Sequence, residues 1–115
     1  MDLILVTQHI EFQACDKFQP RLDKEGVQRR DKDSRLPLWA VELVAWNSGE
    51  GKRQTETILV TVATDNPPSV SQMDWVTVEN LRAIPWVPDN GSRSVRIAYR
   101  ADAVKPMAEA IKKAS

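Results

Sequence analysis

The chain contains the stretch Pro37-Leu-Trp-Ala-Val-Glu-Leu-Val-Ala-Trp46 and, beyond the turn Asn47-Ser-Gly-Glu-Gly51, the stretch Thr55-Glu-Thr-Ile-Leu-Val-Thr-Val-Ala-Thr64. Both stretches are rich in β-branched and aromatic residues and are bounded by glycine or proline, which is typical of β-strands. A short turn that contains glycine brings two such strands side by side. The sequence therefore predicts a central antiparallel hairpin.

Further strand-like runs lie on both sides of this hairpin. Residues 3–6 and 10–18 predict a first strand, either straight or bent, that runs into Gln19-Pro20. Asp65-Asn-Pro-Pro-Ser69 ends the second strand of the hairpin, because proline donates no hydrogen bond to a ladder. Residues 74–79 and 81–86 predict a fourth strand. Residues 94–104 predict a fifth strand, which Lys105-Pro106 ends.

Five strands at this spacing indicate an all-β fold, a small five-stranded barrel of the oligonucleotide-binding type (OB-fold). A protruding charged loop, which we call the arm (residues 21–35), is expected between the first two strands. Residues 1–104 are expected to form a single β-barrel domain, and residues 105–115 a short C-terminal helix or tail. Because strand count does not fix closure, a β-sandwich and an open meander remain alternatives.

Length and cysteine content bound the class of protein. A chain of 115 residues can bury a core as one domain without a disulfide or a metal. Cys15 is the only cysteine, which excludes an intramolecular disulfide. The apolar run Leu3-Ile-Leu-Val6 is too short for a signal-peptide core or a membrane span. We therefore expect a cytoplasmic protein with no membrane partner.

The formal net charge is zero, which argues against binding to nucleic acid by bulk charge. The distribution is uneven. Seven basic and five acidic residues lie between positions 16 and 35. Positions 36–80 hold two basic and six acidic residues, and positions 81–115 hold seven basic and three acidic residues. If the fold brings the arm and the last strand to one side, a modest positive face results. Otherwise these are ordinary solvated charges.

The residue types needed for common catalysis are scarce. His9 is the only histidine, and with Cys15 it gives no spacing that resembles a zinc site. Gly49-Glu-Gly51 lies in a hairpin turn and is not part of a phosphate-binding loop pattern. We expect no enzymatic activity, no metal and no cofactor, although a site made only of carboxylates stays open.

The tryptophans are candidates for stacking on bases. Alternation along the first strand of the hairpin places Trp39 with Val41 and Leu43, so Trp39 is expected in the core. Trp46 falls on the opposite face and is the better exposed candidate. Trp86 lies at a strand end between two prolines, where its ring could cap the barrel or face a ligand.

Arginine binds phosphate through two parallel hydrogen bonds and also stacks on bases. The arm and the hairpin turn would form a basic groove if they lie on one side of the barrel, and three arginines further on would extend it. The alternative is a solubilised loop in which bases alternate with Asp31 and Asp33. The candidate phosphate-binding residues are Arg29, Arg30, Lys32, Arg35, Lys52, Arg53, Arg82, Arg96 and Arg100.

Several short segments of the sequence resemble one known family. They are Pro20-Arg-Leu-Asp-Lys-Glu-Gly26, residues 27–39, Val41 to Ala45, Val76-Thr-Val-Glu-Asn-Leu-Arg-Ala83 with Pro85-Trp86, and Ile97-Ala-Tyr-Arg-Ala-Asp-Ala-Val104. Together they resemble the plasmid replication, integration and excision activators of actinobacterial integrative and conjugative elements. The chain departs from that pattern in the second turn of the arm, where a glycine is expected and Lys32-Asp-Ser34 stands.

The resemblance implies an accessory protein for replication or transfer of a mobile element in the cytoplasm of a bacterium. It brings no defined site, so it assigns no role to any residue. Two functions of different classes follow. The first is binding of single-stranded nucleic acid during replication or conjugative transfer, with single-stranded DNA as the expected partner and RNA left open. The second is a protein-interaction module, with a homodimer left open, that regulates a replication or transfer protein without contacting nucleic acid.

Overall fold

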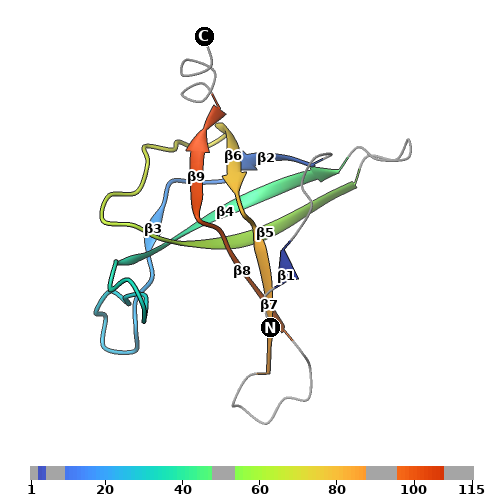
Figure 1. Ribbon diagram of the computed structural model, residues 1–115. Helices are drawn as coiled ribbons and strands as arrows, with labels where there is room; N and C mark the ends of the chain where they lie inside the picture. The colour runs from blue at the N-terminus through green and yellow to red at the C-terminus, as the bar shows by residue number, and fades with distance from the viewer. Residues whose placement is uncertain (1–2, 5–9, 48–53, 88–95, 108–115) are drawn as a thin grey trace.

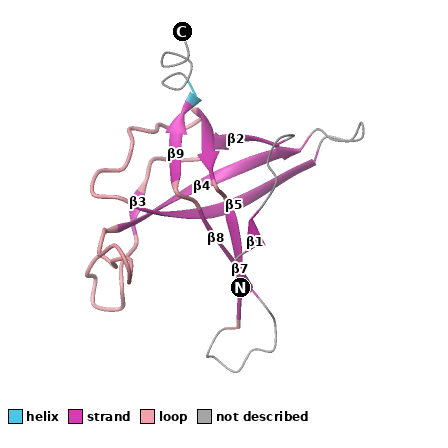
Figure 2. Ribbon diagram, in the orientation of Figure 1, coloured by secondary structure: helices cyan, strands magenta, loops and turns pink. Residues whose placement is uncertain are grey.

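A computed structural model describes residues 3–4, 10–47, 54–87 and 96–107. Those residues form strands, turns and loops (Figures 1 and 2). The strands are β1 (Leu3–Ile4), β2 (Ile10–Ala14), β3 (Gln19–Pro20), β4 (Leu38–Asn47), β5 (Gln54–Ala63), β6 (Trp75–Glu79), β7 (Arg82–Trp86), β8 (Arg96–Arg100) and β9 (Ala103–Pro106). The expected all-β class is therefore confirmed.

The strands belong to one mixed sheet in the order β1-β7-β8-β5-β4-β2-β6-β9, with β3 beside β4. Every pairing is antiparallel except that of β5 with β8, which is parallel. The central hairpin predicted from residues 37–64 is the β4–β5 pair, in register from Leu38 opposite Ala63 to Asn47 opposite Gln54. The path of hydrogen-bonded strands begins at β1 and ends at β9, so it is not closed.

A long, bent hairpin connects the two ends of this path. β6 and β7 follow each other with only Asn80 and Leu81 between them, and β8 and β9 with only Ala101 and Asp102 between them. Asn80 has a φ of 53°, in the left-handed region, which turns the strand at this point. The β6–β9 half of the hairpin joins β2, and the β7–β8 half joins β5. One hairpin thus contributes to both ends of the sheet (Figure 1).

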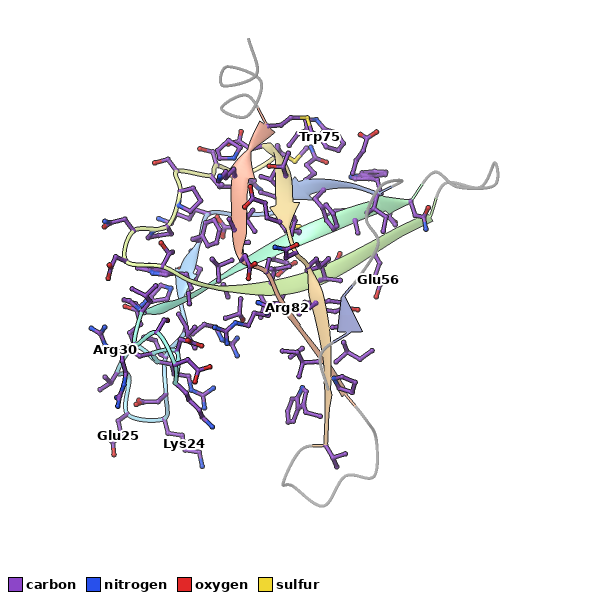
Figure 3. All side chains as sticks on the ribbon, viewed as in Figure 1. Lys24, Glu25, Arg30, Glu56, Trp75 and Arg82 are labelled. Carbon is purple, nitrogen blue, oxygen red and sulfur yellow. The ribbon has the colours of Figure 1, made fainter. Side chains whose placement is uncertain are left out.

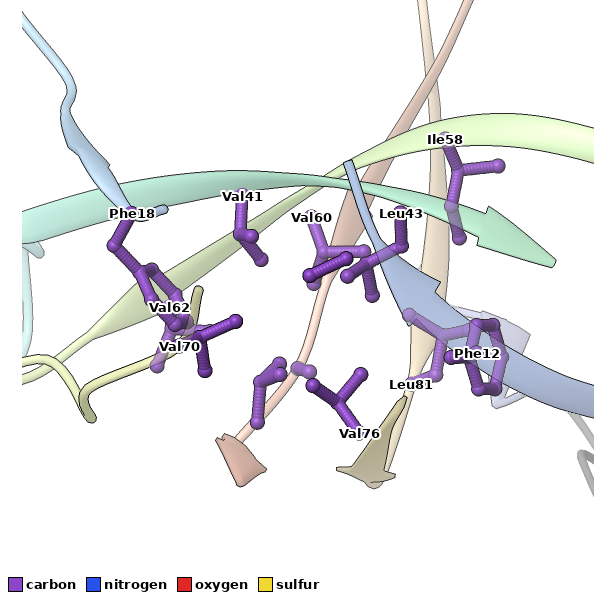
Figure 4. Close-up of a cluster of buried hydrophobic side chains, with 13 residues drawn as sticks. Phe12, Phe18, Val41, Leu43, Ile58, Val60, Val62, Val70, Val76 and Leu81 are labelled. Carbon is purple, nitrogen blue, oxygen red and sulfur yellow. The ribbon is translucent and has the colours of Figure 1, made fainter. Parts of the chain in front are cut away.

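The core lies inside the curve of the sheet (Figure 4). β4 contributes Val41 and Leu43, and β5 contributes Ile58, Val60 and Val62, as alternation predicts. Trp39 packs against this cluster, and its Nε1 donates a hydrogen bond to the Thr64 carbonyl at 3.0 Å. The loop between β5 and β6 adds Val70, which is buried among residues from the strands.

Three expectations about strand ends are wrong. Leu3–Ile4 does not extend the first strand but pairs with β7. The last strand breaks at Ala101 and Asp102 and then continues through Lys105-Pro106, which were expected to end it. Proline is tolerated there because, among the described residues, β9 lies at an end of the sheet and pairs with β6 alone. Residues 108–115, expected as a helix or tail, lie outside the described residues.

Candidate nucleic-acid interface

The arm consists of two tight turns that return the chain to β4. In the first turn, the Asp23 carboxylate accepts hydrogen bonds from the backbone N–H groups of Glu25 and Val27. Gly26 has a φ of 83°, a conformation that glycine adopts without a steric cost. This is the turn that Asp23-Lys-Glu-Gly26 predicts, since the aspartate supplies the side-chain acceptor and the glycine supplies the positive φ.

The second turn is organised by Asp31. Its Oδ2 accepts hydrogen bonds from the backbone N–H and the hydroxyl of Ser34, both at 2.9 Å. Arg35 follows with a φ of 65°, and Arg30 donates from Nη1 to the Arg35 carbonyl at 2.9 Å. The family resemblance places a glycine where Lys32-Asp-Ser34 stands. The left-handed conformation falls on the next residue, Arg35, whose backbone N–H donates to the Asp31 carbonyl at 3.0 Å.

Asp31 also joins the arm to the sheet. Its other carboxylate oxygen, Oδ1, accepts a hydrogen bond from Nη2 of Arg100 on β8, 69 residues further along the chain. The Asp31 side chain is 13% exposed and that of Arg100 is 30% exposed. Hydrogen bonds from the Ser34 backbone, from Arg100 and from the Ser34 hydroxyl lower the pKa of Asp31 well below its ordinary value. Asp31 is therefore a carboxylate at neutral pH.

This ion pair forms a wall common to two surface pockets. One pocket, of about 410 Å³, is lined by arm residues together with Leu38 and Arg100. The other, of about 300 Å³, lies between the arm and β7–β8 and includes Ala63, Arg82 and Asp102. The arm residues of the first pocket are Arg29, Arg30, Asp31, Lys32 and Asp33. Four of the candidate phosphate-binding residues thus meet in one pocket, which we call the arm pocket, and a fifth lies in the next.

Arg82 is the cross-strand partner of Arg100 in the β7–β8 pair. Like charges in that relation repel each other unless each has a counterion. Arg82 donates to the Asp102 carboxylate at 3.0 Å, and Asn80 donates to its other oxygen at 2.8 Å. Each arginine thus has its own aspartate. The side chains of Arg82 and Arg100 remain partly exposed. Figure 3 labels Arg82 near the centre of the molecule and Arg30 on the arm.

Trp86 lies on the same face of the β7–β8 pair as Arg82, four residues along the strand and therefore about 13 Å away. It is 44% exposed. Trp46 is half-buried on the outer face of β4, opposite Glu11 and Thr55. It lies at the far end of the β4–β5 hairpin from the arm, which joins the start of β4. Of the two candidate tryptophans, Trp86 is therefore nearer the arm pocket, whereas the sequence did not rank one above the other.

The remaining candidates are only partly described. Arg35 is exposed in the second turn of the arm, and it does not line the arm pocket. Arg96 is the backbone register partner of Trp86. Lys52 and Arg53, in the turn of the central hairpin, lie outside the described residues, as does His9.

Sequence reasoning did not give Asp31 and Asp102 a role in the site. Asp31 was considered only as an acid that alternates with bases in a solvated loop. Its spacing from Ser34 fits a turn in which a side-chain oxygen accepts backbone hydrogen bonds, and that signal was available in the sequence. The pairing with Arg100 depends on the fold and has no local signal.

Other kinds of site are not supported by the described residues. They include no group of three or more His, Cys, Asp or Glu side chains that could hold a metal ion. Burial, and then Glu42 and Asp16, raise the pKa of the Cys15 thiol, which leaves it protonated and weakly nucleophilic at neutral pH. Within the same residues, no helix has the length and apolar character needed to cross a membrane.

No protein-family model, curated protein or solved structure matches the chain.

Proposed function

We propose that the protein is a non-enzymatic accessory factor that binds single-stranded DNA during replication or transfer of a plasmid or integrative conjugative element in the bacterial cytoplasm. The arm pocket, Arg82 and Arg100 bind phosphates, and Trp86 offers a surface on which a base can stack. The fold that presents them is a five-stranded barrel of the oligonucleotide-binding type.

The barrel is supported by the bent hairpin. If β6 with β7, and β8 with β9, each count as one strand, the pairings run from β2 to β4, to β5, to β8–β9, to β6–β7 and back to β2. A simple meander lacks the parallel contact between β5 and β8. In barrels of this type the loop between the first two strands and the loop between the last two flank the ligand. The arm is the first of these loops.

The observation that carries the proposal is the convergence of Arg29, Arg30, Lys32 and Arg100 on one pocket. The first three are exposed, and only one of the two aspartates in the pocket is paired with an arginine there. Arginine side chains in such a setting bind phosphate oxygens through forked hydrogen bonds. Net charge near zero does not prevent this because phosphate binding responds to local charge.

The test is the salt dependence of binding to a labelled single-stranded DNA. Arg29→Ala combined with Arg30→Ala removes two phosphate contacts, so affinity falls and the slope of log K against log salt becomes shallower by about 1.4, at about 0.7 for each contact. Fluorescence anisotropy at several salt concentrations measures both quantities. Circular dichroism checks that the variant is folded.

Lys17→Ala combined with Lys105→Ala is the matched control. It removes the same charge, and neither lysine lines the arm pocket. The proposal requires that this control keep the wild-type slope. Equal slopes for wild type and the arm variant, or no binding by the wild type at low salt, would contradict it.

A second candidate function is a protein-interaction module. Met73 and Trp75 are exposed where β6 begins, and Trp75 lies far from Arg30 in Figure 3. An exposed apolar surface of this kind suits a protein partner. If this reading is right, Trp75→Ala weakens binding to a replication or transfer protein, and no nucleic acid changes the tryptophan fluorescence.

A further inference from the structure

The two oxygens of the Asp31 carboxylate have separate partners. Oδ2 accepts the backbone N–H and the hydroxyl of Ser34, both within the second turn of the arm. Oδ1 accepts Nη2 of Arg100 on β8. Backbone hydrogen bonds also close the turn, from the Arg35 N–H to the Asp31 carbonyl at 3.0 Å and from the Asp31 N–H to the Leu36 carbonyl at 2.9 Å. The contact with Arg100 can therefore break while the turn keeps its own hydrogen bonds.

The arm is joined to the sheet in two different ways. At its base, the Arg21 N–H donates to the Leu38 carbonyl at 3.0 Å, and the Leu38 N–H donates to the Arg29 carbonyl at 2.8 Å. Further out, the hydrogen bond that joins the second turn to β8, among the residues described, is that of Asp31 with Arg100. The base is thus held to β4 by the backbone, whereas one ion pair of side chains holds the second turn against β8.

This ion pair stands between the two surface pockets. Asp31 and Arg100 line both the arm pocket and the pocket of about 300 Å³ beside β7–β8. The arm pocket also contains the exposed basic residues of the arm, and the second pocket contains Arg82. Separation of Asp31 from Arg100 joins the two pockets into one groove that runs from the arm to Arg82.

The Asp31 carboxylate occupies a donor that a phosphate would use. A carboxylate and a phosphate accept the same charge-assisted hydrogen bonds from a guanidinium group. While Asp31 is paired with Arg100, the pair presents no net charge to a ligand in either pocket. The Arg100 side chain is 30% exposed, so a competing anion in either pocket can reach it. Ion pairs that are partly open to water contribute little free energy, which makes this one displaceable.

We propose that the Asp31–Arg100 pair is an autoinhibitory latch, in which Asp31 substitutes for phosphate on Arg100 until a phosphate of the single strand displaces it and joins the two pockets. This inference rests on the proposed function and specifies how the same site is regulated. The displaced carboxylate and the bound phosphate repel each other, which keeps the second turn away from β8 while the strand is bound.

Asp31→Asn opens the latch with the smallest change in shape. Asparagine keeps an oxygen for Ser34 but presents to Arg100 an amide NH₂ group, which accepts no hydrogen bond. In anisotropy titrations with the labelled single-stranded DNA, this variant binds about fivefold more tightly than wild type, which is the scale of a partly exposed ion pair. The slope of log K against log salt becomes steeper by about 0.7, because Arg100 gains one phosphate contact.

Asp33→Asn is the matched control for charge. Asp33 lines the arm pocket but does not belong to the ion pair, so its variant removes the same charge and leaves the latch closed. Its gain in affinity is smaller, and its salt slope equals that of wild type. A second control uses Arg100→Ala as the background. There the gain from Asp31→Asn falls to that from Asp33→Asn, because the latch acts through Arg100. Circular dichroism checks that each variant is folded.

The outcomes separate the latch from the proposed function. If Asp31→Asn binds the single strand more weakly than wild type, the ion pair prepares the pocket for the strand, and the latch is overturned although single-strand binding stands. The same holds if Asp31→Asn and Asp33→Asn give equal gains, since Asp31 then acts only through its charge. If neither wild type nor Asp31→Asn binds the single strand at low salt, both proposals fail.

Discussion

Asp31 accepts hydrogen bonds from its own turn and pairs with an arginine on a distant strand. Its pKa lies below the ordinary value of 3.8, so the folded chain holds the charged form more strongly than the unfolded chain does. The stabilisation is therefore complete above about pH 4 and is lost as the pH falls below it, toward the pKa of the folded state. At the residue scale, the charge of this carboxylate links the hydrogen bonds of the second turn and the ion pair with Arg100 to pH.

Asp31→Asn tests this linkage. The variant has a lower free energy of unfolding than wild type at neutral pH, and the difference narrows below about pH 4 because wild type then loses the same interaction. Urea unfolding followed by tryptophan fluorescence across this range measures the difference. Asp33→Asn, in the same turn but outside the ion pair, is the control. A difference that stays constant with pH would contradict the role given to Asp31.

Arg35 gives a second prediction at this scale, because its φ of 65° is costly for any residue with a Cβ atom. Arg35→Gly keeps the free energy of unfolding of wild type or raises it by up to about 1 kcal/mol. Glycine adopts this conformation without strain, but it loses more conformational entropy on folding, and the two effects oppose each other. Arg35→Val lowers the stability by about 1–2 kcal/mol, because a branched Cβ fits this region worst. Urea unfolding of the two variants is the measurement. Equal stability of both would show that the backbone here is relaxed.

At the scale of elements, the loop between β5 and β6 contributes to the core through Val70. Val70→Ala leaves a cavity and lowers the free energy of unfolding by about 1–3 kcal/mol. Val27→Ala makes the same chemical change at an exposed position of the arm, and it stays within about 0.5 kcal/mol of wild type. Thermal or urea unfolding compares the two. Similar effects at both positions would mean that Val70 is not part of the core.

The strands that the sequence predicted best are those with one buried face. In β4 and β5, alternation separates Val41 and Val60 from Glu42 and Leu59, and the structure keeps that division. The pairing of Leu3–Ile4 with β7 was not predicted, because a strand of two residues is too short to show an alternating pattern that would identify its neighbour. The continuation of β9 through Pro106 was not predicted. Proline stops a strand only where a backbone N–H must donate to a neighbouring strand, and the sequence does not show which strand lies at the end of the sheet.

At the scale of the whole molecule, the radius of gyration is 15.0 Å, whereas a compact domain of this length has about 13 Å. The principal extents are 44 × 33 × 24 Å, so the molecule is longer in one direction than in the others. Composition indicated that basic residues lie toward both ends of the chain. Their meeting in one pocket could not be predicted, because it depends on the bent hairpin that places Arg100 beside the arm.

The distance along the chain between Asp31 and Arg100 sets an order of events during synthesis. Translation must continue for 69 residues past the acid before its partner arginine exists. Until then the arm has its backbone hydrogen bonds to Leu38 at the start of β4 but no contact with β8, and the pocket lacks one of its cations. Completion of the arm pocket therefore waits for a contact that is long-range in the sequence and forms after both hairpin strands β4 and β5 have been made.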